Sequence, residues 1–302
     1  MADELDWQLC RSFLAVLNEG SLSGAARTLG LTQPTIGRHI EALEQELATP
    51  LFVRSPHGLT PTQAALEMRP HAEAMRVAAA SLRRAVSGAE GVEGEARGTV
   101  RLTASEVIGA EVLPPILARL RERHPRILLE LVLSNRTEDL LRRESDIAIR
   151  MIRPVQSALL SRKVGVTHLG LHAHRDYLAR RGTPGTMDAL GGHAVIGFDK
   201  ESPSIQTLRA MGFRMTREEF AFRTDSDLAQ LALIRAGAGI GVCQLGIARR
   251  EKALVHVLAE DFSYALDLWV VMHEDLRTSQ RMRLVYDHLA AELKAYATTS
   301  SR

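Results

Sequence analysis

The stretch from Ser21 to Leu47, SLSGAARTLGLTQPTIGRHIEALEQEL, contains two helix signals separated by a short turn. Ser21 or Ser23 can cap a first helix over residues 24–29, and Gly30 can end it. Thr32 can cap a second helix, whose first turn tolerates Pro34. Two helices joined by a short glycine-containing turn predict a helix-turn-helix.

The second helix of this motif has two different faces. An apolar face carries Ile36, Ile40, Leu43 and Leu47. The opposite face carries Pro34, Arg38, Glu41 and Gln45. Because such a helix enters the DNA major groove with its N-terminal end first, we expect DNA contacts from five residues near that end: Thr32, Gln33, Pro34, Thr35 and Arg38.

The flanking segments complete a small module. Residues 6–19 form an amphipathic pattern that Gly20 ends. Residues 51–54 and 59–60 predict a hairpin, or wing, that brings Arg54 and His57 near the DNA backbone. The alternative is a three-helix bundle that binds protein. The argument for DNA rests on geometry, because residues 1–61 contain more acidic residues than arginines.

The stretch from Phe13 to Thr60 resembles the DNA-binding domain of the LysR family of bacterial transcriptional regulators. The resemblance is carried by Phe13, Gly20-Ser21, Ala25-Ala26, Leu29, Thr32-Gln33-Pro34, Ile40, Leu43-Glu44, Leu47, Pro50-Leu51-Phe52, Arg54 and Leu59-Thr60-Pro61. It implies a winged helix-turn-helix over residues 1–61. Two positions depart from the family pattern. Gly37 stands where serine is usual, and Ala64 stands where glycine often follows the threonine-proline step.

Residues 62–88 predict a long linker helix, with Thr60 as its cap and Pro61 at its start. Apolar residues alternate at spacings of three and four, which indicates a heptad seam that seeks a partner helix. The resemblance implies dimerisation through Met68, Ala72, Met75, Ala79, Leu82 and Val86, in a homodimer or homotetramer. The alternative is a helix packed on its own domain. Residues 89–98 are glycine-rich and predict a hinge.

From residue 99 onward, predicted strands alternate with helices, which indicates an α/β domain with largely parallel sheets. This region resembles the LysR effector domain. The resemblance is carried by Leu113-Pro114, His124-Pro125, residues 146–150 and residues 236–241. It implies two lobes of the periplasmic-binding-protein fold with an effector cleft between them. We place lobe I at about residues 99–166 and 268–302, and lobe II at about 167–267.

Polar residues follow several predicted strands, where open α/β sheets bind ligands. The candidate effector-binding residues are Ser105, Ser134, Asn135, Arg136, Arg150, Thr224, Asp225, Ser226 and Gln244. The alternative for each is a structural role, such as helix capping by Ser134 or Ser226. Arg136, Arg150 and Arg153 together favour a small anionic effector, most simply a carboxylate. Alternatively, Glu106, Asp139 or Asp225 neutralises these arginines.

Other chemistry is not indicated. Gly237, Gly239 and Gly241 lie between a helix and a strand, the reverse of the order in a dinucleotide site. His168, His172 and His174 lack further ligands for a metal, and we expect no cofactor. No nucleophile–base motif favours an enzyme over a regulator. The acidic N-terminus and the lack of a membrane-length apolar run favour a cytoplasmic protein over a periplasmic solute-binding protein. The expected partners are promoter DNA and a small-molecule effector, with RNA polymerase as a further candidate.

Overall fold

A computed structural model describes residues 5–55, 58–86, 96–135, 145–154, 159–201, 205–206 and 216–300. Its contacts divide the described chain into two compact units. The first contains the described residues up to Val86, and the second contains those from Ala96 onward. The hinge residues 89–95 lie outside the described residues. None of the described helices is both long enough and apolar enough to cross a membrane.

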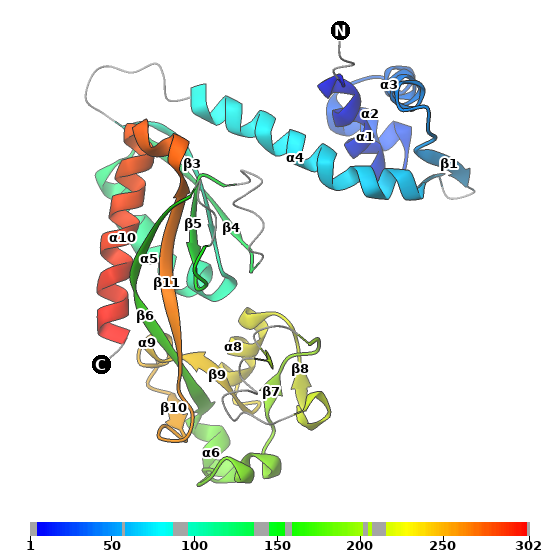
Figure 1. Ribbon diagram of the computed structural model, residues 1–302. Coiled ribbons are helices and arrows are strands. Elements are labelled where there is room, and N and C mark those ends of the chain that lie inside the picture. Colours follow the sequence, from blue (N-terminus) through cyan, green and yellow to red (C-terminus); the bar gives the residue numbers. More distant parts are fainter. Residues whose placement is uncertain are drawn as a thin grey trace. The chain divides into compact units, whose positions relative to one another are not determined.

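The N-terminal unit is a winged helix-turn-helix (Figure 1). It contains α1 (Trp7–Glu19), α2 (Leu22–Leu29), α3 (Gln33–Glu46), β1 (Phe52–Ser55), β2 (Gly58–Pro61) and α4 (Gln63–Val86). Phe13, Ile36 and Leu43 are each fully buried where the first three helices meet. Leu47 departs from the prediction, because it follows the last turn of α3 and is 38% exposed.

The C-terminal unit is built on a seven-stranded mixed sheet. Its first part contains β3 (Gly98–Ala104), a π-helical turn (Ile108–Val112), α5 (Leu113–Arg123), β4 (Ile127–Leu133) and β5 (Ile147–Arg150). The chain ends with β10 (Leu254–Val257), β11 (Tyr264–His273), a 3-10 turn (Glu274–Thr278) and α10 (Gln280–Ser300).

The segment between β5 and β10 contains the remaining elements of this unit. Its elements are β6 (Leu159–His174), α6 (Arg175–Arg181), a 3-10 turn (Asp188–Gly192), β7 (Ile196–Gly197), a 3-10 turn (Arg217–Glu219), β8 (Phe222–Arg223), α8 (Asp227–Arg235), β9 (Ile240–Gln244) and α9 (Leu245–Ala248). β7 and β8 form a separate two-stranded sheet.

The prediction of largely parallel sheets is wrong. β3 pairs in parallel with β4 and β5, but β6 pairs antiparallel with β9, β10 and β11, and β5 pairs antiparallel with β11. The reason is that β6 and β11 run side by side between the two parts of this unit (Figure 1). A parallel pair needs a crossover such as α5, whereas these two strands pass in opposite directions and need none.

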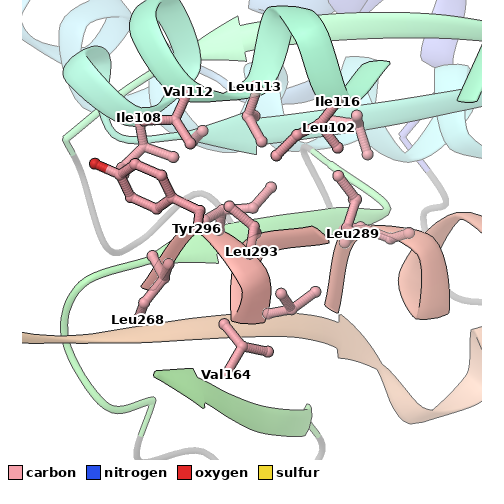
Figure 2. Packing of buried hydrophobic residues seen from close by; sticks show 14 of the residues in the cluster. Leu102, Ile108, Val112, Leu113, Ile116, Val164, Leu268, Leu289, Leu293 and Tyr296 are labelled. Carbon is pink, nitrogen blue, oxygen red and sulfur yellow. The ribbon is translucent and has the colours of Figure 1, made fainter. Parts of the chain in front are cut away.

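One apolar core supports the first part of the sheet and continues toward α8 and α9. Leu102 of β3, Leu113 and Ile116 of α5, and Leu289 and Leu293 of α10 point into it (Figure 2). A second core lies beneath the other end of β6 and includes Leu171 and Tyr177. Strand ends and helix starts between these cores are therefore held in fixed positions.

Candidate DNA-binding and effector-binding sites

The recognition helix α3 is positioned by local caps. Ser21 accepts a hydrogen bond from the Gly24 amide at the start of α2, and Gly30 ends α2 in the left-handed conformation at φ 66°. The Thr32 hydroxyl accepts from the Thr35 amide at 3.3 Å and begins α3. Ser21, Gly30 and Thr32 thus occupy capping positions that the sequence predicts, but α2 begins at Leu22, two residues before its predicted start.

The predicted DNA-contact residues lie on the outer side of this motif. Gln33, Pro34 and Arg38 are exposed. Thr32 and Thr35 bind each other through their hydroxyls at 2.7 Å, so both serve the cap. A shallow hollow on α3 is lined by Leu22, Gln33, Pro34, Gly37, Arg38 and Glu41.

The wing is joined to α3 by a carboxylate that the sequence analysis missed. The Glu44 Oε1 atom accepts hydrogen bonds from the Leu51 amide at 2.6 Å and the Phe52 amide at 3.1 Å. The Leu59 amide donates to the Gly20 carbonyl at 2.9 Å. Arg54 is exposed on β1, and His57 lies outside the described residues. Local patterns do not predict this role of Glu44, because its two partners are seven and eight residues away in the sequence.

Helix α4 begins two residues later than predicted. The Thr62 hydroxyl accepts from the Ala65 amide, so Thr62 is the cap in place of Thr60, and Pro61 ends β2. The predicted heptad seam of α4 has a buried first part and a more exposed second part. Ala65 and Ala72 are buried in the N-terminal core, and Met68 packs against it. The prediction that Ala72 faces a partner helix is therefore corrected.

The later seam positions are more open. Met75 and Ala79 are half-buried, and Leu82 is 67% exposed. The Val86 side chain lies outside the described residues. The part of the seam that remains for a partner therefore begins near Met75.

Two strand ends and a helix start meet in the C-terminal unit. The Asn135 carboxamide, beyond β4, accepts from the Glu106 amide at 3.1 Å and donates to the Asp227 carboxylate at 3.0 Å. The Ser226 hydroxyl caps α8 and also donates to the Glu106 carboxylate at 3.2 Å. Ser105 precedes Glu106 directly. Two predicted residues, Asn135 and Ser226, are thus brought together, whereas the Ser105 hydroxyl donates to the Met151 sulfur at 3.7 Å.

The cluster contains two carboxyl groups, whereas the sequence analysis expected arginines. Burial raises the pKa of the Asp227 carboxyl, the Asn135 hydrogen bond opposes the shift, and the negative charge of Glu106 adds to it. Sequence reasoning missed Glu106 as a cluster member and Asp227 altogether. Each lies next to a predicted site residue, Glu106 after Ser105 and Asp227 after Ser226.

The prediction that Arg150 and Gln244 contact the effector is corrected, because both side chains are buried. Arg150 is 6% exposed, and its guanidinium donates to the Thr103 hydroxyl at 3.2 Å and to the Ile149 carbonyl at 3.1 Å. Gln244 is 4% exposed and accepts from the Tyr296 hydroxyl at 2.9 Å. These side chains hold the sheet and α10 together.

The remaining candidates serve their own loops. The Asp225 carboxylate accepts from the amides of Asp199 and Lys200, and the Thr224 hydroxyl accepts from the Ser226 amide. Ser134 is half-buried, and its amide donates to the Ala104 carbonyl. Arg136 lies outside the described residues.

An ion-pair network joins the far end of α8 to the same lobe as Glu106. The Arg235 guanidinium donates to both carboxylate oxygens of Glu111, at 2.8 and 2.6 Å, and also to Glu251. Hydrogen bonding to Arg235 lowers the pKa of the Glu111 carboxyl. Helix α8 is therefore bound to the other lobe at both of its ends.

The histidines are arranged as a stacked pair. His172 lies against His256 of β10, with ring centroids 4.7 Å apart and planes 11° apart. Within the described part of the chain, no group of three or more His, Cys, Asp or Glu side chains could hold a metal ion. Gly237, at φ 68°, forms the turn between α8 and β9, as the sequence predicts.

Comparisons with known proteins agree with both halves of this fold. Residues 7–66 match the model of the bacterial regulatory helix-turn-helix of the LysR family, and residues 93–294 match the LysR substrate binding domain. The transcriptional regulator CrgA of Neisseria meningitidis serogroup C is 26% identical, with 93% of this chain and 95% of CrgA covered.

Solved structures show the same architecture. A structure of CrgA from Neisseria meningitidis matches with a TM-score of 0.60 and 25% identity, covering 96% of this chain and 99% of that one. Full-length CbnR bound to its target DNA matches with a TM-score of 0.65 at 18% identity, covering 98% and 100%. The similar proteins are named as transcriptional regulators, not as enzymes. The chain therefore belongs to the LysR family and is a DNA-binding transcriptional regulator with a substrate-binding domain.

Proposed function

We propose that this regulator is controlled by a small-molecule effector bound at the cluster of Ser105, Glu106, Asn135, Ser226 and Asp227. The observation that carries the proposal is the pair of contacts Asn135–Asp227 and Ser226–Glu106, which joins the two lobes. A ligand that replaces these contacts changes how the lobes are held together. Such a change can alter the DNA affinity of the attached N-terminal unit.

The proposed effector is anionic, most simply a carboxylate. Ser226 donates to a carboxylate already, since its hydroxyl binds Glu106. An effector carboxylate could take the place of Glu106 and would meet the amides of the first turn of α8, which favour negative charge. The second candidate is an effector with an amino group, favoured by the two carboxyl groups, Glu106 and Asp227, at the same place.

The oligomer is proposed as a homodimer or homotetramer that uses the exposed part of the α4 seam, from Met75 to Leu82. Promoter DNA is contacted by α3 and the wing, and RNA polymerase is a proposed further partner. These roles place the protein in the cytoplasm, where the chromosome is accessible. A gel shift of the full-length protein with its own upstream DNA tests the DNA-binding part, and no shift with any promoter fragment would contradict it.

Thermal-shift titration of the full-length protein tests the effector. Matched libraries of carboxylates, their amides and the corresponding amines are compared. We expect stabilisation by some carboxylates, none by their amides, and loss of the effect in Asn135→Ala and Ser226→Ala. Thr186→Ala removes a capping hydroxyl elsewhere in the domain and is the control. Stabilisation by amines alone would replace the anionic proposal with the second candidate.

A further inference from the structure

Gly37 lies inside the recognition helix without a structural reason to be glycine. Its backbone is helical and does not have the positive φ that requires glycine. A Cβ atom added there would meet only the Leu22 Cδ1 atom, at 3.9 Å, which is an ordinary contact. Because glycine in a helix interior is less favourable than alanine, the fold would be more stable with a side chain at this position.

The missing side chain opens the hollow on α3. Gln33, Pro34, Gly37, Arg38 and Glu41 fall within an arc of about 140° on a helix with 3.6 residues per turn. This arc differs from the one that carries the buried residues Ile36, Ile40 and Leu43. The hollow therefore lies on the face of α3 that a helix-turn-helix presents to base edges.

The lining of the hollow indicates what it accepts. Leu22 and Pro34 supply carbon atoms, and the negative charge of Glu41 offsets the positive charge of Arg38, so that the lining has no net charge that would attract a phosphate group. A small apolar group is therefore favoured over the DNA backbone. Of the four bases, thymine alone presents an apolar group, its 5-methyl, in the major groove.

We propose that the hollow beside Gly37 receives the 5-methyl group of one operator thymine, which makes Gly37 a specificity-determining residue. The inference rests on DNA binding through α3. A side chain at position 37 would extend into the space that the methyl group occupies, and the preference for thymine would be lost.

Replacement of thymine by deoxyuridine tests the proposal, because it removes only the methyl group. A duplex selected from random DNA by the full-length protein is used, and each thymine is replaced in turn. We expect one thymine per half-site at which the replacement weakens wild-type binding about fourfold, as burial of one methyl group predicts. The ratio of the dissociation constant for the deoxyuridine duplex to that for the thymine duplex should be smaller in Gly37→Ala and close to one in Gly37→Leu.

Two controls separate recognition from folding. Gly37→Ala should raise the thermal midpoint while it lowers the preference for the methyl group, and a merely structural role would not give these opposite effects. Ala42→Gly changes the glycine content of α3 at another exposed position and should keep the wild-type thymine preference.

Wild-type protein that binds its selected duplex with no sensitive thymine would overturn the proposal and leave DNA binding intact. So would a Gly37→Leu variant that keeps the wild-type ratio at the same thymine. Failure of the wild type to select any duplex would instead overturn DNA binding through α3, and the proposal with it.

Discussion

Arg38 is the residue of α3 with the clearest expected role in base reading. It is exposed and lies beside the hollow. If its guanidinium makes a bidentate contact with guanine, Arg38→Ala should weaken specific binding by about 1–3 kcal/mol. Binding assays at several salt concentrations check this, with Gln45→Ala, near the C-terminal end of α3, as the control. Equal weakening on all sequences would indicate a phosphate contact, and unchanged affinity would show that Arg38 does not contact DNA.

His172 makes the stability of the C-terminal unit depend on pH. Burial lowers its pKa from 6.5 to about 4, and its Nδ1 atom binds the Gly170 carbonyl at 2.9 Å. Between pH 4 and pH 6.5, the His172 imidazole therefore binds a proton more readily in the unfolded chain than in the folded one. Its contribution to the free energy of unfolding is complete above pH 6.5 and falls as the pH decreases toward 4. The loss attributable to His172 between pH 7 and pH 5 should be about 2 kcal/mol.

Urea unfolding of the wild type and of His172→Asn at both pH values measures this loss. The asparagine amide can keep the hydrogen bond to Gly170 but does not titrate. The difference between the two proteins should therefore narrow at pH 5. Parallel curves would show that His172 does not control the pH dependence. His256, whose pKa burial also lowers, should contribute in the same direction.

Among the elements, α8 has the most direct connection between the lobes. Ser226 at its start binds Glu106, and Arg235 at its end binds Glu111 and Glu251. Arg235→Met leaves two carboxylates without their shared cation and should lower the free energy of unfolding by about 2 kcal/mol, as charge-assisted hydrogen bonds predict.

Urea unfolding at pH 7 checks this value. The double variant Arg235→Met/Glu111→Gln should lose less than the sum of the single variants, because one unpaired charge is removed. Arg69→Ala is the matched control, since its ion pair with Glu73 is exposed on α4 and should be worth less than about 1 kcal/mol. Additive losses at Arg235 and Glu111 would contradict a shared network.

Helix α4 has two different roles along its length. Ala72 is 1% exposed and belongs to the N-terminal core, whereas Leu82 is 67% exposed. Leu82→Glu should therefore split the proposed dimer and leave the N-terminal unit folded. Ala72→Glu places a charge in the core and should unfold that unit. Sedimentation and circular dichroism distinguish the two, and a Leu82→Glu variant that sediments as the wild type would show that Leu82 lies outside the dimer interface.

At the scale of the whole molecule, the two compact units have separate apolar cores. A fragment of residues 96–302 should therefore fold without the N-terminal unit. It should keep the effector response of the full chain and lose DNA binding. Calorimetry and gel shifts test both points. A fragment that lacks a cooperative transition would show that the C-terminal core depends on the rest of the chain.

The helix-turn-helix could be predicted from the residues alone, because its signals are local. The caps Ser21 and Thr32 and the ending residue Gly30 bind amides or carbonyls within five residues. Such contacts depend on residue type and spacing alone. The alternation of strands and helices after residue 99 was also predicted from local patterns.

Which of the predicted site residues meet depends on contacts between distant parts of the chain. Glu106 and Ser226 are 120 residues apart, and Asn135 and Asp227 are 92 apart, so their contact depends on the register of the mixed sheet. The same long-range packing buried Arg150 and Gln244 and placed Ala72 in the N-terminal core. Periodicity identifies the apolar face of a helix, but the surface that covers this face comes from distant parts of the chain.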